Sequence, residues 1–318
     1  MGHLEEEKLE IEKLVKSSIS SYIYGKVLED IDGVGEGIRG KLIEEFHDLP
    51  TIRTKSDTEI NEVVRNKVAT ENIRKTIDSN GLKIPKSKTR HPLAILLPEE
   101  ARTSSFMTGL MTSMGKKFWE ELVKLLAKKN GFEIQDFFSD IPVVTDNSKV
   151  PDKIAALKTK KENKRELTHQ KIFREIKECI DKEKPTYKKK PITGGKNGDV
   201  WLCKEGINYL MDIKTVQTNK GNGLKYSETL IDWYSYCALM EMEKVECFIA
   251  FPYNPYWDSD YWDEEAQKVS PLIPGEEAKV ADELWDFISG KKGIEKLIFE
   301  VFQDLKTEEF DQIIKDVL

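Results

Sequence analysis

Cysteine and histidine are scarce in this chain of 318 residues, which contains four of each. No two cysteines have the CxxC spacing of a structural zinc site, and a chain of this length can be stable without disulfides. We therefore expect the cysteines to be reduced and mostly packed, at Cys179, Cys203, Cys237 and Cys247. The histidines stand singly in the sequence, so they offer no basis for a histidine-ligated metal centre.

Long hydrophobic runs are also missing. No run of about 18 apolar residues occurs, and the first residues, MGHLEEEKLEIEKL, are acidic and helix-forming instead of basic and then apolar. The sequence therefore predicts neither a membrane span nor a secretion signal, and the cytoplasm is the expected location. Because 39% of the residues are apolar, the chain can fill the core of one large domain or of two ordinary ones.

Positive charge is in deficit overall, with a formal net charge of −7, but it is unevenly distributed. Residues 153–190 contain fourteen Lys or Arg against six Asp or Glu, whereas residues 254–318 contain seventeen acids against seven bases. The net charge argues against a nucleic-acid partner, since phosphate binding requires Lys and Arg. The basic stretch suits either such a partner or a solvated helix face, and charge alone does not choose between them.

The first 80 residues predict a helical domain. Residues 5–31 carry apolar side chains at helical spacing without a breaker before Gly25. A tight glycine hairpin, GVG at residues 33–35, then precedes a second helix whose apolar face contains Ile38, Leu42, Ile43 and Phe46. Such a hairpin at a helix N-terminus presents free N–H groups that suit a phosphate oxygen.

This segment resembles the tandem helix-hairpin-helix DNA-binding domain. The stretch LIEEFHDLPTIRTKSDTEINEV matches the connection in that domain, and VVRNKVATENIRKTI occupies the place of the second hairpin, with Arg65-Asn66-Lys67 where a glycine turn is usual. The resemblance implies DNA contacts from the first hairpin and its helix, through Gly33, Val34, Gly35, Arg39 and Lys41, although Arg39 replaces a small residue of the family. A helical bundle that only packs is the alternative. We expect this domain to span residues 1–80 and a linker to follow at 81–91.

A second domain is predicted for residues 92–318. Residues 97–132 predict one or two helices ending at Gly131, residues 133–153 are expected to be less regular, and a basic helix is expected at 165–184. The next segments, DVWLC and INYLMDIKT, are rich in β-forming residues and are separated by the turn-like KEG. They therefore predict a hairpin of adjacent strands.

Charged residues stand at the ends of this predicted hairpin. Asp199 and Asp212 can meet on one side of it, and Lys214 shares the face of Asp212 because strand side chains alternate. Two carboxylates and a main-chain carbonyl oxygen suit Mg²⁺, and a neighbouring lysine could orient or help deprotonate an attacking water. The alternative is a surface salt bridge between Asp212 and Lys214.

The full D-x12-D-x-K arrangement resembles the PD-(D/E)xK nuclease core, with Gly198 in the place of the proline. Several blocks resemble the TdeIII-type family of type II restriction endonucleases, from about residue 91 to 318: HPLAILLPEEARTSSFMTGLMTSMGKKFWEELVKLLAKKNG, GDVWLCKEGINYLMDIKT, CFIAFPYNPY and ADELWDFISGKKGIEKLIFEVFQDL. The resemblance implies an α/β fold, a restriction-endonuclease-like core in which a mixed sheet is flanked by helices, here preceded by an all-α domain.

The resemblance also implies an activity, namely Mg²⁺-dependent double-strand cleavage of DNA at GGNCC, with Mn²⁺ as a substitute metal. Asp199 and Asp212 would be metal ligands and Lys214 the catalytic lysine, while Glu120 in GKKFWEEL would be a further catalytic acid and metal ligand. A two-fold site is most simply cut by a homodimer, and a cognate DNA methyltransferase is the implied genetic partner.

Candidates for base reading lie in the segment after the active strand. Lys220, Asn222 and Lys225 are on a predicted mobile, glycine-rich loop, and solvated loop residues are the alternative for each of them. Gln217 could face the same cleft as the lysine. Two other functions are open on the residues alone: a structure-specific repair or recombination nuclease, and a non-catalytic DNA-binding protein.

Overall fold

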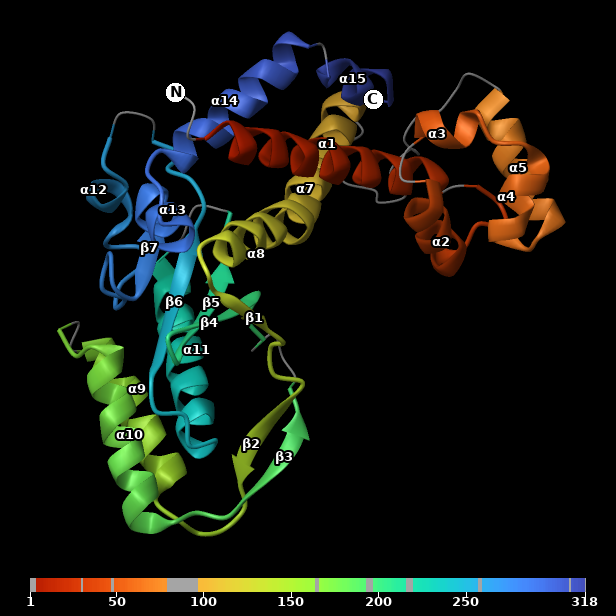
Figure 1. Ribbon diagram of the computed structural model, residues 1–318. Helices are drawn as coiled ribbons and strands as arrows, with labels where there is room; N and C mark the ends of the chain where they lie inside the picture. Colours follow the sequence, from red (N-terminus) through yellow and green to blue (C-terminus); the bar gives the residue numbers. More distant parts are fainter. Residues whose placement is uncertain are drawn as a thin grey trace. The chain divides into compact units, whose positions relative to one another are not determined.

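The computed structural model (Figure 1) describes residues 4–29, 31–46, 49–78, 97–163, 166–192, 197–215, 220–256, 259–308 and 310–317. The chain divides into two compact units. The helical unit consists of Met1–Phe118 and Lys296–Leu318, and the sheet unit consists of Trp119–Glu295. The predicted linker at residues 81–91 lies outside the described residues. Within the described ranges, no helix combines the length and the apolar character needed to cross a membrane.

The helical unit begins with a long helix whose apolar residues recur at every fourth position. Ile11, Val15, Ile19 and Ile23 are buried along one side of α1 (Glu5–Leu28), and three acids in its first turn complement the helix dipole. The predicted all-α N-terminal region is confirmed. The described residues of this unit also form α2 (Glu36–Phe46), α3 (Leu49–Arg53), α4 (Asp57–Val64), α5 (Lys67–Asp78), α7 (Pro98–Met114), α14 (Ile294–Thr307), whose first two residues belong to the sheet unit, and α15 (Asp311–Val317).

Two helix–turn–helix hairpins pack together inside this unit. Gly33 adopts a φ of +85° in the first hairpin, and a Cβ built on it would lie 3.5 Å from the Cβ of Ala69 at the start of α5. The Asn72 side chain donates to the Asp32 carbonyl at 2.9 Å, which ties the second hairpin to the first. In the second hairpin Arg65 takes the left-handed conformation, with a φ of 51°, that glycine usually supplies. The turn predicted there therefore forms without a glycine.

The sheet unit contains a five-stranded sheet in the order β1-β4-β5-β6-β7. The pairs β1–β4 and β4–β5 are antiparallel, whereas β5–β6 and β6–β7 are parallel. The predicted mixed sheet flanked by helices is thus confirmed. The strands are β1 (Glu133–Gln135), β4 (Val200–Lys204), β5 (Ile207–Ile213), β6 (Val245–Phe251) and β7 (Ala278–Val280).

Helices cover both faces of this sheet (Figure 1). On one face α8 (Glu120–Lys129) contacts β1 and β4, and α13 (Asp282–Ser289) brings Phe287 to 5.7 Å from Phe248 between ring centroids. On the other face Leu210 and Cys247 join a buried cluster with Trp233 of α11 (Lys220–Leu239). Two further helices, α9 (Val150–Asn163) and α10 (His169–Glu183), pack against α11 from outside. The helices expected at 97–132 and 165–184 are confirmed. A short π-helix, η1 (Gly115–Trp119), joins α7 to α8, and α12 (Tyr261–Glu265) follows β6.

A separate two-stranded ribbon pairs β2 (Asp140–Val144) with β3 (Tyr187–Pro191). The expectation that residues 133–153 are less regular is therefore wrong, since they contain β1, β2 and the start of α9. The strand β1 pairs with β4 and β2 pairs with β3, in each case with a partner more than forty residues downstream. The local sequence pattern therefore does not predict these short strands.

Candidate active site

The predicted hairpin of β4 and β5 is present, and its register aligns the two aspartates. Glu205 and Gly206 form the turn with positive φ values of 52° and 76°. Val200 pairs with Met211 in an antiparallel ladder, so Asp199 stands opposite Asp212 one step further along. The Asp199 N–H donates to the Met211 carbonyl at 3.0 Å, and the Ile213 N–H donates to Asp199 Oδ2 at 2.7 Å. The hairpin thereby brings both carboxylates to the end of β5.

Asp212 has an unusual electrostatic environment. Burial raises its pKa to about 7; the charge of Lys214 opposes this shift, whereas a hydrogen bond with Asp199 and the charge of Asp199 increase it. The Asp212 side chain is 13% exposed, and its Oδ1 lies 2.6 Å from Lys214 Nζ. Like charges in a buried site oppose ionisation, and here two carboxylates lie close together beside the partly exposed Lys214. A further cation would therefore stabilise the ionised form of both carboxylates.

Lys214 is held at the edge between two strands. Its backbone N–H donates to the Ala250 carbonyl of β6 at 2.8 Å, and its Nζ lies 6.0 Å from the ring centroid of Tyr226 in α11. Burial, together with the charge of Asp212, raises the pKa of Tyr226 to about 12, so this phenol stays protonated beside the carboxylates. Sequence reasoning missed Tyr226, because only the packing of α11 against the sheet brings it to the hairpin.

The glycine that precedes Asp199 has a steric explanation. A Cβ at Gly198 would overlap the ring of Phe137 and would lie 2.9 Å from the ring of Trp233. Phe137 and Trp233 themselves pack edge to face, with centroids 5.2 Å apart. The backbone before Asp199 therefore passes two aromatic rings at a distance that only glycine allows.

Substituting Gly198 with alanine is expected to lower the free energy of unfolding by about 1–3 kcal/mol, because one methyl group would overpack this aromatic contact. Urea unfolding followed by circular dichroism measures the change. Gly40→Ala is the matched control, since its Cβ meets open space in α2, and it should be neutral or slightly stabilising. Equal stability of Gly198→Ala and the wild type would contradict the steric explanation.

Glu120 is the first residue of α8 and is half-buried. Among the described residues, no three His, Cys, Asp or Glu side chains converge to hold a metal ion. The structure therefore brings Asp199, Asp212 and Lys214 together but does not add Glu120 to them as a third ligand. Its catalytic role stays a prediction.

The expected DNA-contacting residues fall into two groups. Gly33, Val34 and Gly35 form the loop between α1 and α2, with Val34 buried; on α2, Arg39 lies 3.8 Å from a carboxylate oxygen of Glu29 and Lys41 is exposed. The other group lies in α11. The prediction of a mobile loop around Lys220, Asn222 and Lys225 is wrong, because these residues form the first turns of that helix. Asn222 is half-buried and Lys225 is exposed. Gln217 lies outside the described residues.

Packing explains why this glycine-rich segment is helical. A Cβ at Gly223 would overlap the backbone of Val269 and Ser270, so the start of α11 is pressed against another chain segment. Glycine is a poor helix former by about 1 kcal/mol, but close tertiary packing overrides that preference here.

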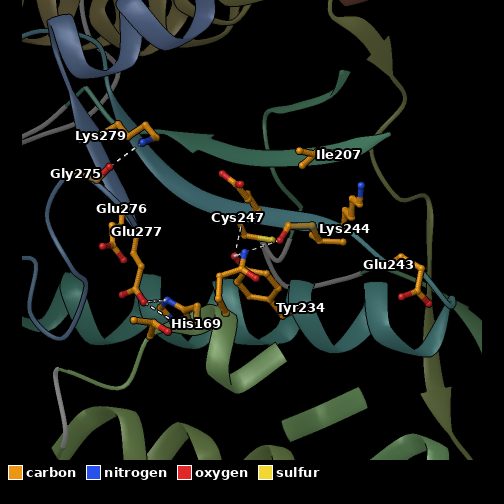
Figure 2. A pocket seen from close by; sticks show the side chains of 14 residues that line it. His169, Ile207, Tyr234, Glu243, Lys244, Cys247, Gly275, Glu276, Glu277 and Lys279 are labelled. Carbon is orange, nitrogen blue, oxygen red and sulfur yellow. Dashed lines mark hydrogen bonds and ion pairs between the residues drawn. The ribbon is translucent and has the colours of Figure 1, made fainter. Parts of the chain in front are cut away.

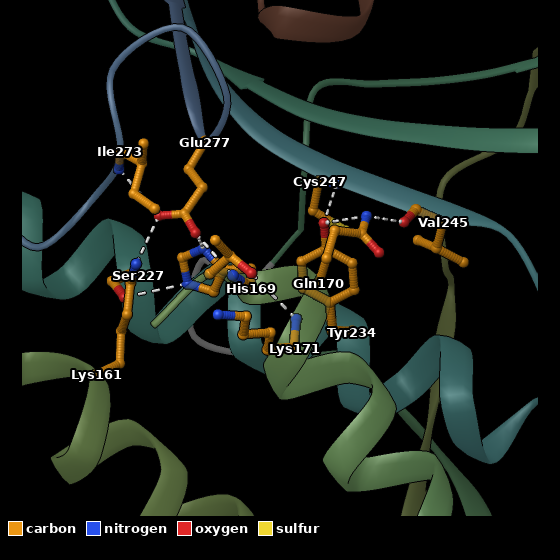
Figure 3. A network of polar contacts seen from close by, with 11 residues as sticks. Lys161, His169, Gln170, Lys171, Ser227, Tyr234, Val245, Cys247, Ile273 and Glu277 are labelled. Carbon is orange, nitrogen blue, oxygen red and sulfur yellow. Dashed lines mark hydrogen bonds and ion pairs between the residues drawn. The ribbon is translucent and has the colours of Figure 1, made fainter. Parts of the chain in front are cut away.

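A buried polar network lies elsewhere in the sheet unit (Figure 3). Glu277, which directly precedes β7, lies 2.8 Å from Lys161 Nζ of α9 and 2.8 Å from His169 Nδ1 of α10. It also accepts the backbone N–H of His169 at 2.7 Å and that of Ile273 at 2.9 Å. His169 Nε2 and Ser227 Oγ of α11 are 3.2 Å apart. These side chains are almost completely buried, so the network joins three helices to the sheet.

A cavity of about 490 Å³ opens beside this network, at the first residues of β6 (Figure 2). Its lining includes Gln170, Tyr234, Cys247 and Lys279 but not Asp199, Asp212 or Lys214. The register of β5 and β6 pairs Asn208 with Val245 at this end and Asp212 with Ile249 towards the other. The cavity and the carboxylate pair therefore lie at opposite ends of the two strands.

Comparisons with known proteins point to one class of enzyme. Residues 51–306 match the family model described as type II restriction endonuclease, HinfI. The type II restriction enzyme MjaII of Methanocaldococcus jannaschii is 23% identical over 220 residues, which is 66% of this chain and 56% of the relative. The chain thus spans little more than half the length of this curated relative. No solved structure matches. The expected type II restriction endonuclease family is confirmed: the chain belongs to the HinfI family of type II restriction endonucleases.

Proposed function

We propose that this protein cuts both strands of double-stranded DNA at a short palindromic site, GGNCC, in a Mg²⁺-dependent reaction. The observation that carries the proposal is the pairing of Asp199 with Asp212 beside Lys214 at the end of β5, in a chain of this family. The expectation of GGNCC comes from the resemblance of the signature blocks described above.

The carboxylate pair fits a divalent metal. Mg²⁺ prefers oxygen ligands and keeps several waters, so two carboxylates can suffice. The raised pKa of Asp212 supports this fit, because it reflects burial and a second carboxylate that a bound cation would compensate. Asp199 and Asp212 would hold Mg²⁺, or Mn²⁺ in its place, with Glu120 as a further proposed ligand. When bound, the ion would supply positive charge beside the scissile phosphate.

The protein groups then have distinct roles. Lys214 Nζ, 2.6 Å from Asp212 Oδ1, orients the attacking water and stabilises negative charge on the phosphate oxygens. The Tyr226 ring restricts where the lysine ammonium can lie. The Ile213 N–H donates to one oxygen of Asp199 and so fixes the orientation of this carboxylate beside Asp212.

A palindromic site implies two copies of this active site, so we propose a homodimer in which each subunit cuts one strand. The glycine hairpin with Arg39 and Lys41, and the start of α11 with Lys220, Asn222 and Lys225, are the proposed DNA contacts. A cytoplasmic location and a cognate methyltransferase that protects the host DNA complete the proposal.

One observation favours a second candidate function. The two hairpins packed through Gly33 and Ala69 are the arrangement that the helix-hairpin-helix resemblance implies. A structure-specific repair or recombination nuclease would use such hairpins on branched or damaged DNA, without a preferred sequence.

Digestion of a plasmid of known sequence with Mg²⁺ tests both, with Asp212→Ala run beside the wild type. We expect discrete fragments whose ends map to GGNCC, absent with the variant. Discrete ends at another sequence would refute the proposed site only. Sequence-independent degradation that the variant abolishes would favour the repair nuclease, and intact DNA with both proteins would refute a nuclease.

A further inference from the structure

The basic stretch at residues 153–190 contains two kinds of lysine. Those on α9 and α10 mostly face acids: Lys153 lies 2.7 Å from Glu175, and Lys158 lies 2.6 Å from Asp232. Lys160, Lys161 and Lys177 likewise form ion pairs. These lysines hold helices together, so the solvated helix face explains only part of the charge.

Three consecutive lysines of β3 behave differently. Lys188, Lys189 and Lys190 are exposed, and none forms an ion pair within the described part of the chain. Asp140, across from Pro191, is the sole acid in β2 and β3. The two strands therefore carry three lysines against one acid, which is a net positive charge on a protein whose net charge is −7.

This charge is carried by an ordered element. The Thr145 N–H donates to the Thr186 carbonyl at 2.9 Å at one end of the ribbon, and the Ile192 N–H donates to the Ser139 carbonyl at 3.0 Å at the other. The Asp146 carboxylate accepts hydrogen bonds from the Thr186 backbone and from Ser148, which lower its pKa to about 2. Because hydrogen bonds fix both ends of the ribbon, it loses little conformational entropy when it binds a partner.

The end of the ribbon at which Asp140 pairs with Pro191 adjoins the candidate active site. Phe137, three residues before β2, packs against Gly198, the neighbour of Asp199. On the other strand, Ile192 is separated from Asp199 by only six residues of chain. Because side chains alternate along a strand, Lys188 and Lys190 project from one face and Lys189 from the other. The lysines can therefore reach phosphates on both sides of the ribbon.

We propose that the β2–β3 ribbon binds the phosphate backbone of double-stranded DNA through Lys188, Lys189 and Lys190, and so holds the duplex against the catalytic hairpin. This inference rests on the proposed function. The shape and the charge agree, since a two-stranded ribbon fits the major groove of DNA and phosphate contacts position a protein on the duplex. Lysines on an exposed strand can also prevent edge-to-edge aggregation, and the experiment separates the two roles.

The test is the salt dependence of DNA binding by the full chain, measured by fluorescence anisotropy with a labelled duplex containing GGNCC and with EDTA present. The test variant is K188Q/K189Q/K190Q. The control K8Q/K16Q/K296Q removes the same charge from lysines that are paired with acids in the helical unit. The magnitude of the slope of log affinity against log salt should fall by about 2–3 in the test variant, since each phosphate contact contributes about 0.9, and by less than about 1 in the control. K188R/K189R/K190R should keep the wild-type slope.

A wild-type slope for the soluble, folded K188Q/K189Q/K190Q protein would overturn the proposal, whether or not part of that protein aggregates. An equal fall in the control would also overturn it, because net charge would then be the cause. Failure of the proposed function is distinguishable: a wild type that never cuts DNA, but whose binding slope still depends on the ribbon, would refute the nuclease and leave the ribbon contact standing.

Discussion

Asp212→Asn is expected to lose DNA cleavage by a factor on the order of 10³ or more and, at about pH 8, to unfold with a higher free energy than the wild type. Cleavage is expected to fall because the amide removes the charge of a proposed metal ligand and of the partner of Lys214. Stability rises because the wild-type carboxyl must ionise in a buried site next to Asp199. Loss of activity with a gain in stability identifies a residue that is retained for chemistry.

The sign of the pH dependence follows from the direction of this shift. The folded-state pKa of Asp212, about 7, is above the ordinary value of 3.8. Its contribution to wild-type stability is therefore fully present below 3.8 and is lost as the pH rises through about 7. The advantage of Asp212→Asn should be near zero at about pH 4 and should approach on the order of 4 kcal/mol above pH 7, since the shift from 3.8 to about 7 is about three pKa units and each corresponds to about 1.4 kcal/mol.

Urea unfolding at a series of pH values and single-turnover cleavage of a plasmid measure the two effects. Asp304→Asn, at an exposed carboxylate of α14, is the matched control and should change neither. Cleavage within about tenfold of the wild type would contradict the catalytic assignment. A destabilised Asp212→Asn would instead show that the carboxylate is held for structural reasons.

Glu277→Ala is expected to destabilise the protein by about 3–5 kcal/mol, the largest stability effect that we expect from a single substitution. The Glu277 carboxylate accepts hydrogen bonds from Lys161 Nζ and from the backbone N–H groups of His169 and Ile273, and it is almost completely buried. Burial would raise the pKa of Glu277, but His169 and Lys161 outweigh this effect and lower it, so the carboxyl is ionised at neutral pH. Its removal takes the acceptor away from several buried donors together.

Thermal and urea unfolding measure this loss, and Glu246→Ala, at an exposed position of β6, should cost less than about 0.5 kcal/mol. A double-mutant cycle with Lys161→Met should show strong coupling, with the double variant less destabilised than the sum of the single variants. Burial lowers the pKa of His169, so its contribution to stability is present above its ordinary value of 6.5 and is lost as the pH falls. A loss below about 1 kcal/mol for Glu277→Ala would refute a structural role for the network.

The core of the candidate site could be predicted from the sequence because it is local. Asp199, Asp212 and Lys214 lie within or next to two strands joined by a two-residue turn, so pattern and register suffice to bring them together. Tyr226 could not be predicted, because only the packing of α11 against the sheet brings it to the hairpin. The network around His169 could not be predicted either, because it joins segments that are far apart in the sequence. The start of α11 resembles a loop in the sequence because its glycines are poor helix formers, and β3 cannot be predicted because YKKKP has no apolar alternation.

The helical unit is closed by the last residues of the chain. Lys8 near the start of α1 pairs with Asp304 of α14 at 2.7 Å, and the rings of Phe118 and Phe302 pack 6.0 Å apart. During synthesis all of Trp119–Glu295 is therefore translated before Lys296–Leu318 can complete that unit. A nascent chain on the ribosome would carry the β4–β5 hairpin before residues 296–318 are available to the helical unit, and a deletion of residues 296–318 would remove helices that belong to that unit.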